Sequence, residues 1–425
     1  MTDRIVFIHL AGATRAVPAG QLTLVEQGVQ LQASRFAYGR RYRDRSDALP
    51  VDPASLPLAV RGGSEWQVPV NGLVGFGALR DATPDAWGRR VIENRRRAPP
   101  NSLPESVYLD EAGPNRAGAL DVRASPTSEP ADGALPGLMD LAHLVEAAER
   151  VEAGLPVPAH LEVLFAGAPS VGGARPKAVV VADGRQWIAK FPSHGDSFDV
   201  PAVERATLEL AREAGLDVPA TRLERLADGR AVMLVERFDR VRVAGGFARR
   251  HMVSALTLLG LHEHDSPASS YAAMVEALAV QGVQGSIDDD RRELFGRMVF
   301  NILVSNDDDH LRNHAFLCDP GARGWRLSPL YDVVPKPQVA QERFLHLSVG
   351  PQGRAARLDN AMASAGRFGL LPQAAATIAD RVMRVVRRWR EVFEANEVAT
   401  AQCDRIASAF RRGHDVGAEA VERLL

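Results

Sequence analysis

Cysteine is scarce in this sequence, and a long apolar run is absent. Only Cys318 and Cys403 occur among 425 residues, too few and too far apart for a disulfide framework or a cysteine metal site. A reducing, cytoplasmic environment is therefore expected. No segment approaches the roughly 18 apolar residues of a membrane-spanning helix. The N-terminus, "MTDRIVFIHLAG", opens polar and its apolar run is short, so we expect no signal peptide.

Charge of one sign is not in excess either. The chain has 51 Lys and Arg against 53 Asp and Glu, a formal charge of −2, which gives no global footprint for nucleic acid. Local basic clusters such as "RRVIENRRR" and "RVMRVVRRWR" alternate with apolar residues, and we interpret them as solvated helix faces or partner contacts. The 46% hydrophobic and 24% charged content is ordinary for a globular protein, and the length allows two or three domains.

The first part of the chain has mixed structure. We predict strands in "RIVFIHLAG" and "LPLAVRGG", then a helix in "TPDAWGRRVIENRRR" that Thr83 and Pro84 open. The segment 124–137 is rich in Pro, Gly, Ser and acid, which is typical of a linker, and a helix follows in "LMDLAHLVEAAERVEAG". The prediction is an α/β N-terminal subdomain over 1–123, then a linker and helix over 124–158.

Two further regions follow, one rich in strands and one in helices. Over 159–245, "KAVVVAD" and "RQWIAKFP" form a hairpin across "ADGR", "RAVMLVERFD" adds a strand, and a helix in "VPAVERATLELAREAGL" ends at Gly215. Over 246–425 helices dominate, in "MVEALAVQ", "RRELFGRMVFNILVSN" and "QAAATIADRVMRVVRRWREVFEAN". A small sheet with one helix, followed by a larger helical region, predicts a two-lobed α+β fold with a cleft between the lobes.

The stretch "SNDDDHLRNHAFL", residues 305–317, holds the most chemistry. Asp308 stands five residues before Asn313, and Asp332 follows Asn313 by 19 residues in "LSPLYDVVP". A kinase catalytic loop has this spacing, with an Asp base, an Asn on metal and a later metal-binding Asp. The carboxylate would accept the proton of an attacking hydroxyl, and the oxygen ligands suit Mg²⁺. His310 would lie inside the loop as an orienting group at the nucleotide.

Upstream residues supply the other needs of phosphoryl transfer. Lys190, at the end of a predicted strand, could reach the nucleotide phosphates and pair with Glu204 on the following helix. The glycines of "PSVGGARPK" permit close backbone approach, so that amide groups could form an anion nest. Glu236, Arg237 and Phe238 stand where an inter-lobe hinge would offer backbone groups to an adenine.

Each of these features has a plainer interpretation. His310 and His314 could be zinc ligands on one helix, although no third nitrogen or sulfur ligand is evident. The glycine segment could be a hairpin turn, and the segment ending at Phe238 an ordinary buried strand with a charged end. The joint order of the motifs, rather than any one of them, favours a nucleotide site.

Taken in order, "SVGGARPK", "IAKFP", "VERFDR", "NDDDHLRN" and "PLYDV" resemble the HipA family of serine/threonine-protein kinases, the toxin halves of bacterial type II toxin–antitoxin systems. "FGALRDATPDAWGRRVI" and "YLDEAGPNRAGALDV" look like the N-terminal subdomain of that family, and "HLSVG" like a segment after its metal-binding Asp. The resemblance covers most of the chain and implies a protein-kinase-like fold, with an N-lobe over 159–245 and a C-lobe over 246–425.

The resemblance also implies roles for individual residues. Asp308 matches the catalytic aspartate, Asn313 and Asp332 the magnesium ligands, and Lys190 the lysine on the phosphates. The matching phosphate loop comprises Gly172, Gly173, Ala174, Arg175, Pro176 and Lys177, and Glu236 to Phe238 match the adenine-side hinge. Ser170 matches an autophosphorylated serine, and a phosphate there, carrying about −1.5 to −2 charges, would repel the nucleotide.

Two positions depart from the family pattern. Acids flank Asp308 on both sides, so its assignment over Asp307 or Asp309 rests on the spacing to Asn313, and the extra carboxylates would raise magnesium affinity or the pKa of a neighbour. Pro176 stands where the family more often has an acidic residue, which would stiffen the loop.

The implied function is that of an ATP- and Mg²⁺-dependent kinase of the persistence-toxin type, held in check by a small helix-turn-helix antitoxin. An aminoacyl-tRNA synthetase is a plausible protein target, and contact with DNA would come through the antitoxin as co-repression. One alternative is a small-molecule phosphotransferase of the aminoglycoside or choline kinase type, which lacks the region before residue 160 in this form. Another is a degenerate kinase that only joins an antitoxin on DNA.

Overall fold

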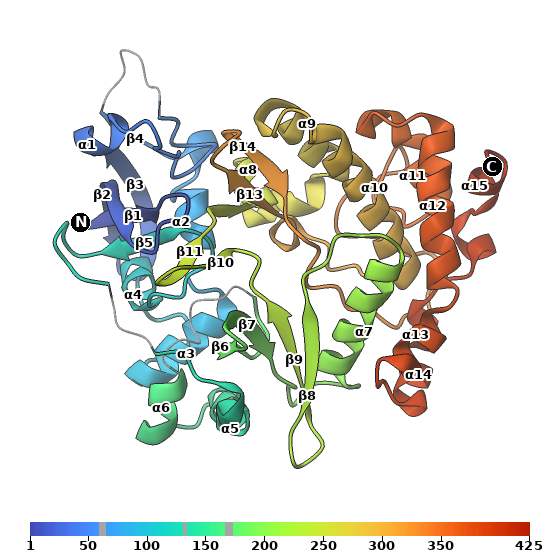
Figure 1. The fold of residues 1–425 in the computed structure, drawn as a ribbon, viewed down its shortest axis with the longest axis horizontal. Coiled ribbons are helices and arrows are strands. Elements are labelled where there is room, and N and C mark those ends of the chain that lie inside the picture. Colours follow the sequence, from blue (N-terminus) through green and yellow to red (C-terminus); the bar gives the residue numbers. More distant parts are fainter. Residues whose placement is uncertain (59–64, 131–133, 166–172) are drawn as a thin grey trace. The chain divides into compact units, whose positions relative to one another are not determined.

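The computed structural model describes residues 1–58, 65–130, 134–165 and 173–425, shown as coloured ribbon in Figure 1. These residues form two compact units. The first consists of Met1–Gly195 with Glu224–Leu261, and the second of Asp196–Leu223 with His262–Leu425. The units are groups of mutually packed residues, and the domain boundaries at 123, 158 and 245 stay predictions. In the described ranges no helix is both long enough and apolar enough to cross a bilayer.

An antiparallel five-stranded sheet begins the first unit, in the order β4-β3-β2-β1-β5. Its strands are β1 (Thr2–His9), β2 (Ala16–Gln27), β3 (Gln30–Tyr38), β4 (Trp66–Gln67) and β5 (Leu120–Arg123). Apolar side chains of the alternating strands, such as Val6, Ile8, Leu22 and Phe36, are fully buried on one face. The remaining elements of this N-terminal part are α1 (Arg40–Arg43), η1 (Val70–Gly72), α2 (Gly77–Asp81), α3 (Ala86–Arg96) and α4 (Glu105–Glu111).

A second antiparallel sheet of the first unit contains β6 (Lys177–Ala182), β7 (Arg185–Lys190) and β9 (Ala231–Glu236), with β7 in the middle. Asp183 and Gly184 both have positive φ, 51° and 70°, which a tight hairpin between β6 and β7 requires, so the predicted "ADGR" turn is confirmed. One buried cluster joins this sheet to α3 and α5; its members include Trp87, Leu144, Val180, Ala189 and Leu234.

Short elements complete the first unit: η2 (Leu138–Asp140), α5 (Leu141–Glu152), α6 (Ala159–Phe165), β10 (Arg240–Val243), β11 (Gly246–Arg249), β12 (Met252–Ser254) and α8 (Ala255–Leu258). Strands β10 and β11 pair in an antiparallel ribbon. Strand β8 (Thr221–Arg225) spans the boundary between the two units.

Helices dominate the second unit. They are α7 (Val200–Glu213), α9 (Tyr271–Gln281), α10 (Ile287–Val304), α11 (Leu358–Ala363), α12 (Pro372–Val386), α13 (Trp389–Ala395), α14 (Thr400–Ile406) and α15 (Glu419–Glu422). Short stretches of 3₁₀ helix lie at η4 (Glu263–Ala268), η5 (Leu311–Asn313), η6 (Ala365–Phe368), η7 (Ala407–Ala409) and η8 (Gly413–Val416). Strand β13 (Ala315–Asp319) pairs with β14 (Gly324–Leu327) in a hairpin. Helix α10 is central, with α9, α11 and α12 packed on it.

Most predicted helices are present, with local differences. Helix α3 begins at Ala86 after Asp85, whereas Thr83 finishes α2 by donating its hydroxyl to the carbonyl of Leu79. The single helix predicted after residue 372 is two helices, α12 and α13, interrupted at Arg387 and Arg388. The strand predicted in "LPLAVRGG" is wrong for residues 56–58, which are irregular, and the rest of it lies outside the described residues.

Candidate active site

The acidic turn, residues 305–317, follows directly after helix α10. The last two turns of α10, "MVFNILV", are buried on every side, because α9, α11 and α12 surround the helix. The helix ends at Ser305, whose φ of 53° lies in the left-handed region, and the Asn306 amide then donates to the carbonyl of Asn301. Ser305 Oγ donates to the carbonyl of Ala409 at 2.6 Å, which fixes the exit of the chain from the helix. The turn therefore starts from a rigid base.

The structure places Asp308, Asn313 and Asp332 in the same unit. The side-chain amide of Asn313 donates to the backbone carbonyl of Asp308 at 2.7 Å, so the asparagine closes the loop on the aspartate. Asp308 is exposed, yet crowding in the loop removes part of its hydration and raises its pKa, as do the nearby carboxylates of Asp332 and then Asp307. His310, with Nε2 at 3.7 Å from Asp308 Oδ1, opposes that rise.

Asp332 has a strained backbone. Its φ of 58° is in the left-handed region, which asparagine and aspartate enter more readily than other non-glycine residues. The preceding Tyr331 is tied back to the acidic turn, because its hydroxyl donates to the carbonyl of Arg312 at 2.8 Å. Strain of this kind is costly and is found most often at functional sites.

The donor set of this cluster fits a magnesium ion. Two mutually repelling carboxylates beside an amide oxygen offer the hard oxygen atoms that Mg²⁺ prefers. Within the described ranges no group of three or more His, Cys, Asp or Glu residues forms a complete metal cage. Mg²⁺ often takes only one or two protein ligands, with phosphates and water completing its shell, and Asn313 and Asp332 stay its predicted ligands here.

The two aspartates beside Asp308 have other partners. Asp307 Oδ2 lies 2.9 Å from Lys336 Nζ and accepts from the Gln338 amide at 3.0 Å. Asp309 is buried, and accepts from the Tyr271 hydroxyl at 2.7 Å and from the His346 amide nitrogen at 2.6 Å. Burial raises the pKa of Asp309 to about 7 despite these hydrogen bonds. Of the three, Asp308 is the most exposed, with 74% of its side chain accessible against 23% for Asp307.

The zinc alternative for His310 and His314 is wrong. The two residues do not share a helix, because residues 306–310 have no regular secondary structure and only the single 3₁₀ turn η5 separates the histidines. His314 is buried with its ring edge-on to Tyr271 at 5.4 Å between centroids, and burial lowers its pKa to about 3. It is a neutral core residue. His310 lies beside Asp308, and its orienting role stays a prediction.

In the first unit the structure describes the later part of the predicted phosphate loop, Gly173 to Lys177. Ser170 and Gly172 lie outside the described residues. Gly173 has a φ of 109°, and a Cβ on it would collide with Lys177 Nζ, so the Lys177 ammonium lies against this glycine. Ala174 is exposed, Arg175 half-buried, and the carbonyl of Pro176 accepts from the Phe191 amide at 3.0 Å. The backbone conformation requires glycine at 173, whereas the contact is with the end of a flexible side chain that can move aside.

Lys190 stands directly opposite Lys177 in the pairing of β6 with β7. Two lysines thus mark one end of this sheet, which suits the binding of an anion. Glu204 is buried on α7 in the second unit, whereas Lys190 belongs to the first. An ion pair between them stays a prediction.

The predicted hinge ends in a buried ion cluster of the first unit. Glu236 pairs with Arg185 at 2.7 Å, and Phe238 is half-buried. The Arg237 guanidinium donates to both carboxylate oxygens of Asp239 and to the carbonyls of Asn115 and Arg116. Its amide nitrogen donates to the Gln186 carbonyl. Arg237 therefore ties β9 to the segment before β5, and nucleotide binding by it stays a prediction.

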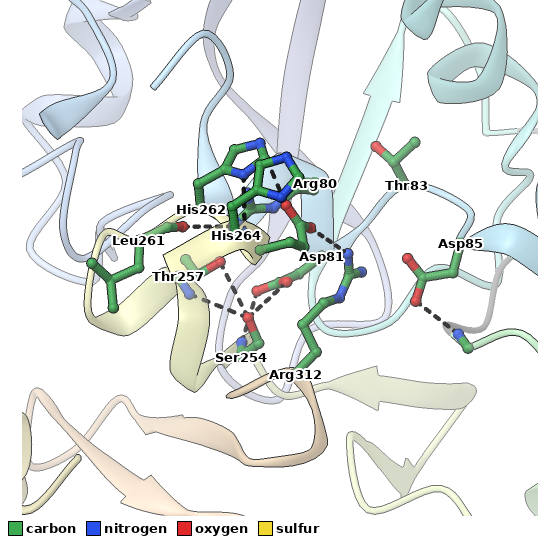
Figure 2. A network of polar contacts seen from close by, with 12 residues as sticks. Arg80, Asp81, Thr83, Asp85, Ser254, Thr257, Leu261, His262, His264 and Arg312 are labelled. Atoms are coloured by element: carbon green, nitrogen blue, oxygen red, sulfur yellow. Dashed lines mark hydrogen bonds and ion pairs between the residues drawn. The ribbon is translucent and has the colours of Figure 1, made fainter. Parts of the chain in front are cut away.

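Sequence reasoning missed Asp85 and Trp87, which bond to the phosphate loop. Asp85 Oδ2 accepts from the Gly173 amide at 2.7 Å, and Trp87 Nε1 donates to the carbonyl of Lys177 at 2.9 Å. Figure 2 shows Asp85 turned toward that amide nitrogen. Both residues lie in the quoted motif "TPDAWG", but only its value as a helix start is readable locally. Tyr271 and Asn301, which bond each other beneath the acidic turn at 2.9 Å, carried no signal at all.

A small antiparallel sheet with two lysines at one end, and a helical region that presents an Asp, Asn and Asp set, are features of a protein with a kinase-like fold. A solved structure has the same fold: the Shewanella oneidensis MR-1 toxin–antitoxin complex of HipA, HipB and its operator DNA. The match to one chain of it has a TM-score of 0.66 over 98% of this chain and 97% of that chain, at 18% identity. The α+β, protein-kinase-like fold class is confirmed.

Family models and curated relatives give the family. The model of the HipA-like C-terminal domain matches residues 169–389, more than half of the sequence, and the chain belongs to this family. "Putative kinase Y4mE" of Sinorhizobium fredii is 28% identical over 70% of this chain and 71% of its own length. "Putative kinase Y4dM" of the same organism is 27% identical over 53% of this chain and 56% of its own length. The resemblance stated from the motifs is confirmed.

Proposed function

We propose that this chain is an ATP-dependent serine/threonine-protein kinase that acts as the toxin of a type II toxin–antitoxin module in the cytoplasm. The observation that carries the proposal is the closed loop in which Asn313 bonds the backbone of Asp308, with the carboxylate of Asp332 close enough to raise the Asp308 pKa. Membership of the HipA-like family and relatives named as kinases support it.

In this proposal each residue has one task. Asp308 accepts the proton of the attacking serine or threonine hydroxyl, and its raised pKa makes it a stronger base. Asn313 and Asp332 would hold Mg²⁺, which when bound neutralises charge on the nucleotide phosphates. Lys190 and the loop ending at Lys177 bind those phosphates, His310 orients Asp308, and Glu236 to Phe238 face the adenine. Because protonation of Asp308 stops proton acceptance, activity rises with pH through its raised pKa.

The partners follow from the same likeness. A small HipB-like antitoxin would bind the chain, restrain it and bring it to operator DNA for co-repression; the solved relative was crystallised with HipB and its operator. The substrate would be a host protein, with an aminoacyl-tRNA synthetase as the favoured class. Autophosphorylation at Ser170 would switch the enzyme off by placing a charged phosphate beside the nucleotide.

Labelled ATP tests this function directly. The purified chain is incubated with Mg²⁺ and γ-labelled ATP, alone and with a bacterial lysate. Label is expected on the chain and on a lysate protein, and is lost in Asp308→Ala but retained in Asp289→Ala, which removes an exposed carboxylate on α10. Loss of label from the chain in Ser170→Ala would support the autophosphorylation site. Absence of label from every protein, or label that survives Asp308→Ala, contradicts the proposal.

A further inference from the structure

Asp85 immediately precedes helix α3 but does not cap it. An aspartate in this position usually accepts a hydrogen bond from the first turn of its own helix. In the described part of the chain its carboxylate instead accepts from the amide of Gly173, 88 residues further along, at 2.7 Å. The N-terminus of α3 therefore has no side-chain cap from Asp85, whose carboxylate bonds the predicted phosphate loop instead.

Trp87 adds two bonds to the same segment. Its amide nitrogen donates to the carbonyl of Gly173 at 3.2 Å, and its indole Nε1 donates to the carbonyl of Lys177 at 2.9 Å. Both backbone groups of Gly173 and the far end of the segment are therefore bonded to the start of α3. The Trp87 side chain is fully buried in the cluster that joins α3 and α5 to β6, so this anchor is rigid.

The position of Gly173 also restricts the Lys177 ammonium. The ammonium of Lys177 touches the Cα side of Gly173, at a point where even a Cβ would not fit. A shift of Gly173 would therefore move or release the ammonium. Asp85 fixes the position of Gly173, and Gly173 in turn restricts the positions open to the Lys177 side chain.

We propose that Asp85 is a positioning residue for the nucleotide phosphates, acting through Gly173 on the loop and on Lys177. The inference rests on the proposed function, because the loop binds phosphates only if the chain uses a nucleotide. It goes beyond that function by giving the region before residue 160 a direct task at the nucleotide site. A bond from an amide to a carboxylate is among the stronger hydrogen bonds, so its loss should cost the loop about tenfold or more in occupancy of its binding conformation.

Charge alone would predict the opposite effect of removing the Asp85 carboxylate on ATP binding. A carboxylate near the loop repels phosphate, so its removal would tighten ATP binding if Asp85 had no bracing task. Two substitutions separate these effects. Asp85→Ala removes both the charge and the acceptor, whereas Asp85→Asn removes the charge but keeps an oxygen that can accept from Gly173.

Asp81 offers a matched control four residues earlier. Its Oδ2 accepts from the Ser254 amide at 2.7 Å and its Oδ1 from the Ser254 hydroxyl at 2.9 Å (Figure 2). Asp81→Ala thus removes a comparable carboxylate bond to backbone in the same unit, away from the loop. It should lower the melting temperature as Asp85→Ala does, without an effect on phosphate recognition.

The test measures equilibrium binding of ATP and of adenosine by calorimetry on the full chain, with thermal melts for each variant. We expect Asp85→Ala to raise the Kd for ATP about tenfold with the Kd for adenosine unchanged, and Asp85→Asn and Asp81→Ala to keep the wild-type ratio of the two. An unchanged ratio in Asp85→Ala, or tighter ATP binding in both Asp85 variants, overturns the inference. A wild-type chain that binds no ATP would instead contradict the proposed function.

Discussion

Three consecutive aspartates of the acidic turn have three different surroundings. Asp308 is exposed, Asp307 is tied to Lys336 and Gln338, and Asp309 is buried against Tyr271. Identical side chains therefore have different chemistry, because accessibility and partners set whether a carboxylate can meet a substrate hydroxyl. The sequence alone distinguished them only by their spacing to Asn313.

Alanine substitution of each aspartate should give three distinct outcomes. Asp308→Ala should lower the rate of label transfer at least about 100-fold, because it removes the base. Asp307→Ala should change it within about threefold, since a partly exposed ion pair contributes little. Asp309→Ala should lower the free energy of unfolding by about 1–3 kcal/mol, because buried donors lose their acceptor. Label-transfer rates measure the effects on activity, and denaturant melts measure the effect on stability. An Asp307→Ala chain as inactive as Asp308→Ala would assign the role of base to Asp307.

Gly173 should tolerate no side chain. Gly173→Ala imposes an unfavourable φ of 109° and pushes the Lys177 ammonium out of its place, so nucleotide binding should fall at least about tenfold. Gly229 is the matched control: its φ is 86°, but nothing lies within 4 Å of a Cβ there. Gly229→Ala should cost about 1 kcal/mol of stability and leave the Kd for ATP unchanged. Equal loss of binding in both variants would show that only backbone strain matters.

At the scale of elements, α9 and α10 support the acidic turn through one buried network. The Tyr271 hydroxyl on α9 donates to Asp309 and accepts from the Asn301 amide on α10 at 2.9 Å, and Asn306 donates to Asn301 Oδ1 at 3.1 Å. Buried polar groups of this kind are costly when one partner is lost. The network therefore fixes the position of the acidic turn relative to α9 and α10.

Tyr271→Phe tests that support. Removing the hydroxyl takes the donor from Asp309 Oδ2 and the acceptor from the Asn301 amide, so the free energy of unfolding should fall by about 1–3 kcal/mol and kcat should fall with it. Tyr38→Phe is the control, because its buried hydroxyl also makes two hydrogen bonds, with Leu56 and Val51, but in the other unit. It should lose similar stability in guanidinium melts and keep kcat. An unchanged kcat in Tyr271→Phe would refute the supporting role.

Elements that depend on local chemistry could be predicted from the sequence. The β6–β7 hairpin follows from Asp183 and Gly184, and α7 ends where Gly215 adopts a φ of 79°. The break between α12 and α13 could not be predicted, because no glycine or proline marks Arg387 and Arg388. A helix boundary set by packing leaves no local signal.

The candidate site likewise has one part that could be predicted from the sequence and one part that could not. The spacing of Asp308, Asn313 and Asp332 was readable because those residues are close in the sequence, with the β13–β14 hairpin between Asn313 and Asp332. The bond of Asp85 to Gly173 was not, because 88 residues separate them and only folding brings them together. Nor could the sequence show that the Arg237 side chain enters a buried ion cluster with Asp239 and carbonyls near Arg116.

At the scale of the whole molecule, buried histidines set the response to acid. Burial lowers the pKa of His9 to about 3, of His251 to about 4 and of His314 to about 3. An unfolded histidine has a pKa of about 6.5, so below that pH the unfolded chain binds protons that the native chain does not. These three residues, two in the first unit and one in the second, therefore destabilise the fold as pH falls from about 6.5 toward 4.

Asp309 acts with the opposite sign. Its native pKa of about 7 exceeds the usual value near 3.9 for an unfolded aspartate, so the native chain holds its proton over that range. Its contribution to stability is present at low pH and is lost as pH rises toward 7. Burial also raises the pKa of Asp52 and Asp308 and lowers that of His346. Four histidines therefore act against three aspartates, which leaves a net loss of stability on acidification from this set.

We therefore expect the free energy of unfolding to fall from pH 7.5 to pH 5, with each of these histidines contributing up to about 1.4 kcal/mol per pH unit below 6.5. His251→Gln isolates one of them, because His251 Nε2 bonds the Val51 carbonyl at 3.0 Å and a glutamine amide can donate there without titrating. Urea melts at several pH values should show a shallower decline for this variant. The control, Tyr38→Phe, removes a hydrogen bond from the Val51 amide without adding or removing a group that titrates between pH 5 and 7.5, so it should leave the slope unchanged. Parallel slopes for wild type and His251→Gln would mean that acid acts on other groups.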